Sequence, residues 1–293
     1  MAQLDSIVEH IESTIHQSLQ PYQLSSIGGG CINSAYQLKT NQLTYFIKLN
    51  QPSLSLMFEA EALGLQEMAA TKSVRVPSVI CQGTTHEHSY LVLEYISLKG
   101  LRGNSNIALG EQLAHMHKVK QPYFGWQMDN TIGSTPQIND QTHDWLTFWR
   151  EQRLGQQLKF AAQNGYSGRL QSRGEKLMDE LDKLLENHQP HPSLLHGDLW
   201  GGNAAADENG QPVIYDPACY YGDRETDLAM TELFGGFGRD FFAAYNAIYP
   251  VDSGYSTRKT LYNLYHILNH LNLFGGGYMG QAESMIDQLL SEI

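Results

Sequence analysis

The 293-residue sequence has few cysteines and no long apolar run. Its three cysteines, Cys31, Cys81 and Cys219, are widely scattered, and their spacing fits neither a disulfide framework nor a metal-binding motif. Every apolar stretch is shorter than the roughly 18 residues that a membrane-spanning helix needs. The first 19 residues carry acidic side chains and have apolar residues at helical spacing, which is unlike a signal peptide. These features predict a cytoplasmic protein without a membrane partner.

Positive charge is also scarce, with 19 Lys and Arg against 31 Asp and Glu and a formal net charge of −12. Such a surface repels the nucleic-acid backbone and anionic lipids, so the sequence predicts neither as a partner. Any anionic ligand must then be held by a local group of donors. The hydrophobic content of 41% is typical of a globular protein. The length allows one large domain or two coupled ones.

The pattern of apolar residues changes between residues 94 and 103. Before this point, short alternating runs predict antiparallel strands, and one Ala- and Leu-rich segment at 56–71 predicts a helix. After it, helical periods dominate at 105–118, 143–163, 169–188, 224–234, 257–273 and 281–291. We therefore expect an α+β fold with a β-rich N-terminal lobe at 1–96 and a mainly helical C-terminal lobe at 97–293. Ligands usually bind where two lobes meet.

Two features of the N-terminal lobe are typical of phosphate binding. Gly28, Gly29 and Gly30 separate two predicted strands, and backbone amides of such a loop can cover phosphate oxygens, although a simple turn has the same pattern. Lys48 interrupts an apolar strand, and a carboxylate on the following helix would fix its ammonium against phosphates. Glu59 and Glu61 both lie near the start of that helix.

Of these two carboxylates, Glu61 is the predicted partner of Lys48. Its neighbours at helical spacing, Met57, Leu65 and Met68, are apolar, which indicates that this face of the helix points inward. Glu59 is then the residue expected to face solvent. The prediction of Glu61 over Glu59 depends only on these apolar neighbours of Glu61.

The segment at 193–223, SLLHGDLWGGNAAADENGQPVIYDPACYYGD, concentrates polar side chains around short apolar runs. Asp198 and Asn203 have the spacing of a kinase catalytic loop, in which the Asp orients or deprotonates the acceptor hydroxyl and the Asn binds metal. A short hairpin can return Asp216 beside Asn203, so that both hold Mg²⁺ on nucleotide phosphates. The set predicts an ATP-dependent phosphotransferase. Gly197 replaces the usual Arg, which argues against a protein kinase switched by a phosphorylated loop.

Several longer motifs, which span residues 28–278, resemble the fructosamine kinase (ketosamine-3-kinase) family. They are GGGCIN, MFEAEALGL, LLHGDLWGGN, YDPACYYGDRETDLAM, ELFGGF and LYNLYHILNHLNLFGGGY. The family belongs to the aminoglycoside-phosphotransferase-like branch of the protein-kinase-like fold. The resemblance implies a kinase that uses ATP and Mg²⁺ to phosphorylate the 3-hydroxyl of ketosamines, after which the sugar is released and the amine is repaired.

The resemblance also implies roles for individual residues. Asp198 would be the catalytic base, Lys48 would bind phosphate, and Asn203 and Asp216 would bind the metal. Asp227 would brace the catalytic loop.

The adenine-binding hinge is implied at Glu94, Tyr95 and Ile96. There the carbonyl oxygen of Glu94 and the N–H of Ile96 would contact the base.

Three further residues carry hypotheses about the acceptor and about regulation. Trp200 could form a wall for the sugar or pack in the core. His270 could line the acceptor pocket or pack beside His266, since no third ligand or HExxH motif marks the two as a metal pair. Cys31 lies in the glycine-rich loop, where oxidation of an accessible thiol would distort phosphate binding.

The sequence leaves two alternatives to a ketosamine kinase. One is a kinase for another hydroxyl compound, such as an aminoglycoside, choline or a free sugar, and the other is a nucleotide-binding pseudokinase. The presence of Lys48, Asp198, Asn203 and Asp216 together favours an active enzyme. Whether the ketosamine is a metabolite or a protein adduct, and whether the protein is a monomer or a homodimer, stay open.

Overall fold

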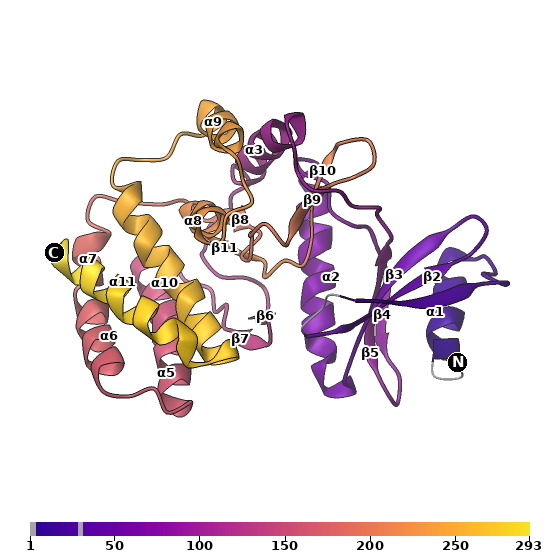
Figure 1. Ribbon diagram of the computed structural model, residues 1–293, viewed down its shortest axis with the longest axis horizontal. Coiled ribbons are helices and arrows are strands. Elements are labelled where there is room, and N and C mark those ends of the chain that lie inside the picture. Colours follow the sequence, from indigo (N-terminus) through magenta and orange to yellow (C-terminus); the bar gives the residue numbers. More distant parts are fainter. Residues whose placement is uncertain (1–3, 29–31) are drawn as a thin grey trace.

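A five-stranded antiparallel sheet forms the N-terminal part of the computed structural model, which describes residues 4–28 and 32–293 (Figure 1). The strands are β1 (Gln23–Ile27), β2 (Ser34–Lys39), β3 (Thr44–Asn50), β4 (Val79–Thr84) and β5 (Ser89–Glu94). Their order in the sheet is β1-β2-β3-β5-β4. The antiparallel meander predicted from the first three alternating runs is therefore confirmed for β1, β2 and β3, whereas β5 and not β4 pairs with β3.

Helices α1 (Asp5–Ile15) and α2 (Ser55–Ala70) pack on opposite faces of this sheet. Along β5, Tyr90 and Val92 belong to the apolar cluster of α1, while Leu91 and Leu93 belong to the cluster of α2. This alternation follows from the two-residue period of a strand. Lys48 pairs with Leu91 in register, so it lies on the α2 face. The α2 cluster continues into the C-terminal half of the chain.

The C-terminal part is mainly helical, as expected. Its helices are α3 (Asn104–Met116), α4 (Trp145–Phe148), the π-helix η3 (Trp149–Leu154), α5 (Gly155–Gln163), α6 (Arg169–Asp179), α7 (Leu181–Leu184), α8 (Glu225–Leu233), α9 (Arg239–Ile248), α10 (Tyr255–Phe274) and α11 (Met279–Ser291). One short 3-10 helix, η4 (Gly276–Tyr278), lies in this part, and another, η2 (Pro52–Leu54), precedes α2 in the N-terminal part. Three short antiparallel pairs complete it: β6 (Asn130–Ile132) with β7 (Thr135–Gln137), β8 (Ser193–Leu195) with β11 (Tyr220–Gly222), and β9 (Ala204–Ala206) with β10 (Pro212–Ile214).

The structure differs from the predicted helices in three places. The segment at 143–163 contains a π-helical turn where the buried Arg153 packs its guanidinium 4.0 Å from the ring centre of Tyr220. The segment at 169–188 is interrupted at Glu180, between α6 and α7. Helix α9 was not predicted, because it buries only Phe241 and Tyr245 and its apolar period is short. Within the described ranges, no helix combines the length and hydropathy needed to cross a membrane.

Helix α2 approaches the chain after Asp216 so closely that position 64 requires glycine. A Cβ added to Gly64 would lie 2.9 Å from the Cβ of Cys219 and 3.7 Å from the Cγ of Pro217. Because real Cβ atoms do not come this close, a larger residue would push α2 away from the segment at 216–221. The absence of a side chain at this position thus sets the spacing between α2 and residues 216–221.

We expect Gly64→Ala to lower the free energy of unfolding by about 1–3 kcal/mol, the usual range for overpacking. Denaturant unfolding measures this loss. The matched control is Gly280→Ala in α11, where an added Cβ meets nothing within 4 Å. That change should stabilise the protein by up to about 1 kcal/mol through helix propensity. A stabilising Gly64→Ala would contradict the close contact.

Candidate active site

Two short strand pairs bring the polar residues of the segment at 193–223 together. Asp198 and Asn203 lie on the loop between β8 and β9, and Asp216 lies on the loop between β10 and β11. The Ala218 amide donates to the carbonyl oxygen of His196 at 2.9 Å, and the Tyr215 amide donates to that of Asn203 at 3.1 Å. The hairpin expected to return Asp216 to Asn203 is therefore present.

The amide of Asn203 orients the carboxylate of Asp198. Its Nδ2 donates to the backbone oxygen of Asp198 at 2.9 Å and to its Oδ2 at 3.2 Å. Since Nδ2 makes these bonds, Oδ1 of Asn203 is the atom that can bind a cation. One side chain thus positions the proposed base and offers a metal ligand.

The environment of Asp198 raises the pKa of its carboxyl to about 7. Burial is the largest cause, because it disfavours the charged form, and the negative charge of Asp216 acts in the same direction. The hydrogen bond from Asn203 opposes both and lowers the pKa. A carboxyl that titrates near neutral pH can accept a proton from a hydroxyl and release it again.

Lys48 connects the sheet to this loop through two carboxylates. Its Nζ lies 2.6 Å from Oε1 of Glu61 on α2 and 2.6 Å from Oδ1 of Asp216. Burial lowers the pKa of Lys48, but the two carboxylates outweigh burial and hold the pKa above its ordinary value. The predicted partner of Lys48 is Glu61, and the structure contains this pair. Asp216 also contacts Lys48, so the three side chains form one group of charges.

Asp216 and Asn203 have the chemistry of a site for a hard cation. The Asp216 side chain keeps 48% of its exposure, and Lys48 occupies only its Oδ1. Its backbone has a φ of 58°, in the left-handed region that Asp tolerates better than most residues. A carboxylate oxygen and an amide oxygen suit Mg²⁺, which takes its other ligands from phosphates and water. The residues present therefore fit this ion.

Asp227 braces the catalytic loop from α8. Its Oδ2 accepts from the His196 amide at 2.7 Å, and its Oδ1 accepts from the Gly197 amide at 2.8 Å. His117 Nε2 lies 3.1 Å from the same carboxylate. Burial raises the pKa of Asp227, but the hydrogen bond and charge of His117 outweigh it, and the pKa falls below its ordinary value. Neither the position nor the neighbours of His117 in the sequence mark it as part of this group.

His196 organises the same loop as a neutral imidazole. Its Nδ1 accepts from the Asp198 amide at 3.2 Å, so its Nε2 carries the hydrogen and donates to the Tyr215 carbonyl at 2.9 Å. Burial is the largest cause that lowers its pKa. His196 thus links the loop that contains Asp198 to the strand end before Asp216.

Gly197 occupies a position that no other residue could occupy without rearrangement. Its φ is 82°, and an added Cβ would lie 2.0 Å from the carbonyl oxygen of Ala218. The departure from the kinase pattern at this position therefore has a steric reason. The backbone of residue 218 fills the space that a side chain at 197 would need.

The predicted nucleotide-binding residues are only partly within the described chain. Gly28 is described, whereas Gly29, Gly30 and Cys31 lie outside it, so the hypotheses about those three residues stay predictions. At the predicted hinge, the Tyr95 amide donates to Thr44 at 3.4 Å. The N–H of Ile96 has no hydrogen-bond partner among the described residues and can donate to a ligand.

The side chain of Glu94 is bound by other residues of the chain and is not part of the predicted adenine contact. Its Oε1 accepts from Arg75 at 2.7 Å, and its Oε2 accepts from the Ser78 hydroxyl at 3.2 Å. The predicted contact used the backbone carbonyl of Glu94, which these bonds do not involve. The ion pair instead fixes the end of β5.

Trp200 and His270 are brought together by Phe234, a residue that the sequence did not single out. Phe234 lies 6.3 Å from Trp200 and 4.8 Å from His270 between ring centres. Phe274 and Tyr278 continue this aromatic group at 5.4 and 5.2 Å from His270. Trp200 and Phe234 are exposed, so neither is a core residue. The group begins two residues after Asp198 and offers flat apolar surface beside it.

His270 within this group presents a hydrogen-bond acceptor. Its Nδ1 donates to the His266 carbonyl at 2.8 Å, so the neutral imidazole keeps a lone pair on Nε2. Burial lowers the pKa of His270 and favours this neutral form. Its Nε2 can therefore accept from a hydroxyl or an ammonium group.

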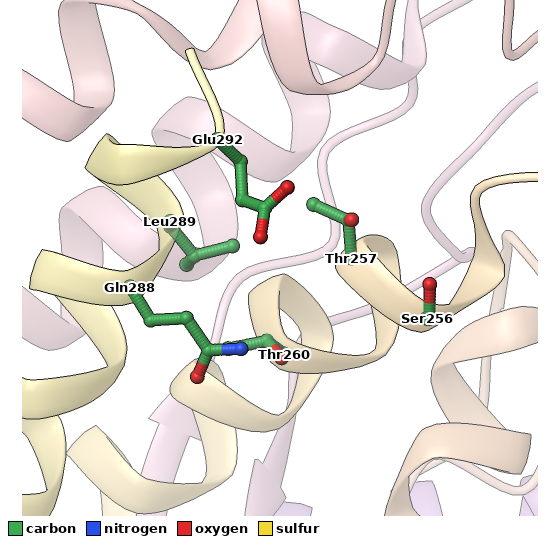
Figure 2. Close-up of a pocket in the computed structure, with 6 residues that line it drawn as sticks. All are labelled: Ser256, Thr257, Thr260, Gln288, Leu289 and Glu292. Carbon is green, nitrogen blue, oxygen red and sulfur yellow. The ribbon is translucent and has the colours of Figure 1, made fainter.

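Two other groups of side chains in the described chain have no part in this site. A cavity of about 160 Å³ lies between α10 and α11, where Glu292 points toward Thr257 and Gln288 points toward Thr260 (Figure 2). His188, Glu225 and Asp252 lie close enough to share a cation. However, Glu225 is already paired with Arg258 at 2.7 and 2.9 Å, and His188 is bonded to Asp223. Their charges are therefore compensated without a metal.

A family model described as fructosamine kinase matches residues 3–292. A probable ketoamine kinase of Synechocystis sp. is 49% identical over 286 residues, which cover 97% of this chain and 96% of the relative. The chloroplastic protein-ribulosamine 3-kinase of Arabidopsis thaliana is 46% identical over 277 residues, which cover 94% and 84%.

Solved structures agree with the fold. A crystal structure from Haemophilus somnus, of a candidate fructosamine-3-kinase, superposes with a TM-score of 0.90 at 30% identity and covers 97% and 96% of the two chains. A choline kinase of Streptococcus pneumoniae gives a TM-score of 0.67 at 16% identity over 100% of both chains, which shows the fold alone. The α+β, protein-kinase-like fold predicted from the sequence is confirmed.

Proposed function

The chain belongs to the fructosamine kinase family, and we propose that it is an ATP-dependent kinase that phosphorylates the 3-hydroxyl of ketosamines such as fructosamines and ribulosamines. One observation carries the proposal. Lys48, Asp216, Asn203 and Asp198 form a single connected group. Lys48 donates to the carboxylate of Asp216, and Nδ2 of Asn203 donates both to the backbone carbonyl oxygen of Asp216 at 3.5 Å and to the carboxylate of Asp198 at 3.2 Å. The group contains the parts that phosphoryl transfer requires, which are a lysine for the phosphates, ligands for the metal and a base for the acceptor hydroxyl.

We propose that each member acts on a different part of the reaction. Lys48 contacts phosphate oxygens of ATP, and Asn203 and Asp216 hold Mg²⁺, which neutralises phosphate charge when bound. Asp198 accepts the proton of the acceptor hydroxyl. The oxygen of that hydroxyl forms a bond to the γ-phosphorus of ATP, while the bond between this phosphorus and the oxygen of the leaving ADP breaks. The pKa of Asp198 near 7 supports this exchange of a proton. Glu61 acts through Lys48 by fixing its ammonium.

The aromatic group beside Asp198 supports a sugar-like acceptor. Trp200 and Phe234 supply exposed rings against which the C–H face of a sugar can pack, and His270 supplies an acceptor atom for a hydroxyl. We propose these residues as the acceptor site. The hinge at Glu94, Tyr95 and Ile96 is the proposed adenine site, since no group in the described part of the chain accepts a hydrogen bond from the Ile96 N–H.

The remaining parts of the proposal concern compartment and assembly. A cytoplasmic protein fits the described cysteines, Cys81 and Cys219, which are buried free thiols. The oxygen-rich ligand set supports Mg²⁺ as the ion. The ketosamine is the proposed partner, with the protein acting as a monomer or homodimer.

The first test is ADP release by purified protein with Mg·ATP and a panel of acceptors. We expect turnover with fructosyl-lysine and ribulosyl-lysine, and little with choline or an aminoglycoside. Phosphorus NMR of the product should place the new ester at O3. Turnover with choline alone would overturn the acceptor class. ATP that raises the melting temperature without any turnover would favour a pseudokinase.

A further inference from the structure

A second cavity of about 400 Å³ lies between α2 and the chain at 121–127. It lies within the range of about 300–1,000 Å³ that small-molecule sites occupy. Its lining includes none of the residues assigned above to ATP, metal or acceptor binding. Three glutamines, one glutamate and two aromatic residues provide the chemistry of its wall: Gln66, Gln121, Gln127, Glu67, Tyr123 and Trp126.

The carboxylate of Glu67 is the charged group of this cavity. Its Oε2 accepts from Trp126 Nε1 at 2.6 Å, and its Oε1 accepts from the Tyr221 hydroxyl at 2.7 Å. Both donors are neutral, and no Lys, Arg or His pairs with Glu67 among residues 4–28 and 32–293. A carboxylate has about four acceptor positions, so each oxygen keeps one for a ligand. The cavity therefore contains an oriented negative charge without a counter-ion.

The glutamines add groups that both donate and accept hydrogen bonds. Gln66 and Gln127 are exposed, and their carboxamides make no hydrogen bond with the described part of the chain. A carboxamide matches a hydroxyl group, which also donates and accepts. Tyr123 adds a half-buried ring to the same wall. The combination suits hydroxyl groups around a cationic amine.

We propose that this cavity is a second ligand site, which binds a small polyhydroxylated amine. The amine lies against Glu67, and the hydroxyl groups bond to Gln66 and Gln127. This inference goes beyond the proposed function, because it concerns a site that takes no part in phosphoryl transfer.

The position of the cavity couples it to the active site through α2. Three residues of α2, spaced three apart, face the segment at 216–221. Glu61 is linked to Asp216 through Lys48, which bonds to both carboxylates. Gly64 packs against Cys219, and Glu67 accepts a hydrogen bond from Tyr221. A ligand that joins Glu67 to the chain at 121–127 holds the same helix in place. Ligand binding should then favour the arrangement in which Glu61 fixes Lys48, and so lower the KM for ATP.

Calorimetric titration with glucosamine tests the site on full-length Asp198→Asn protein, in which turnover is removed. We expect saturable binding, with affinity about tenfold lower for sorbitol, which lacks the amine, and for butylamine, which lacks the hydroxyls. Gln66→Ala with Gln127→Ala should weaken glucosamine binding about tenfold, as expected for two lost hydrogen bonds. Gln281→Ala, an exposed glutamine of α11, is the matched control and should change nothing.

Several outcomes would overturn the proposal. Unchanged binding in the double glutamine variant would do so, and so would loss of binding in Trp200→Ala, which would place the amine in the acceptor site instead. In the wild-type enzyme, glucosamine should lower the KM for ATP at least twofold, and this effect should vanish in the double variant. Failure of the proposed function leaves the titration unaffected, because binding to Asp198→Asn requires no reaction.

Discussion

Asp198→Asn is expected to reduce turnover strongly while making the free protein more stable above neutral pH. The change should lower kcat by about 10²- to 10⁴-fold, the usual contribution of a positioned base. Asn keeps an oxygen that can accept from Asn203 Nδ2, so the loop geometry should survive. Initial rates with a ketosamine acceptor measure the loss. ATP binding, followed by thermal shift, should persist.

The gain in stability follows from the sign of the pKa shift. The folded protein raises the pKa of Asp198 to about 7, so its proton is bound more tightly in the folded state than in the unfolded state. The stability that this proton contributes is fully present below the unfolded pKa and is lost as the pH rises through about 7. At pH 8 the variant should therefore be more stable than wild type by about 1–2 kcal/mol, since partial solvation reduces the effect.

Denaturant unfolding at pH 5 and pH 8 tests this linkage, with exposed Asp182→Asn as the control. The advantage of Asp198→Asn should be larger at pH 8 than at pH 5. An equal effect at both pH values would show that Asp198 has an ordinary pKa in the folded protein. Retained turnover would remove Asp198 from the role of base.

Lys48→Met is expected to damage both catalysis and folding. Loss of the ammonium removes the donor to phosphate and should lower kcat/KM by about 10²- to 10³-fold. It also leaves Glu61 buried without its partner, which should cost about 3 kcal/mol of stability. Burial raises the pKa of Glu61. Below that raised pKa Glu61 is neutral, so the stability loss should shrink as the pH falls.

A second substitution separates the two effects of Lys48→Met. Adding Glu61→Leu removes the unpaired carboxylate and should restore most of the stability without restoring activity. Lys39→Met, at an exposed strand position in β2, is the matched control and should change stability by less than about 0.5 kcal/mol. If the double variant were as unstable as Lys48→Met, the ion pair would not be the source of the loss. Urea unfolding and ADP release measure the two effects.

The fold class and most of the connected site could be predicted from local patterns in the sequence. Alternating runs at β1, β2 and β3 predicted the meander, because strand period is a local property. The spacing of Asp198, Asn203 and Asp216 limited them to two adjacent loops, since a short hairpin is the simplest path between them. Glu61 could be chosen over Glu59 because helical faces follow from a fixed angle per residue.

The contacts between residues far apart in the chain could not be predicted, because they depend on how distant segments pack. His117, the residue that follows the end of α3, contacts Asp227, and Phe234 joins Trp200 to His270, but no local spacing links these residues. The glycine at 197 has its reason in the carbonyl oxygen of Ala218, 21 residues later in the chain.

Local sequence patterns also do not predict the pKa of a buried side chain or the contacts that form the second cavity. The sequence shows that Asp198 is a carboxylic acid, whereas its pKa depends on burial and on the distance to Asp216, which only folding sets. Glu67 has no motif around it, and its two neutral partners, Trp126 and Tyr221, lie 59 and 154 residues away. Local periodicity determines which faces of helices and strands turn inward. Packing between distant segments determines which polar groups then meet.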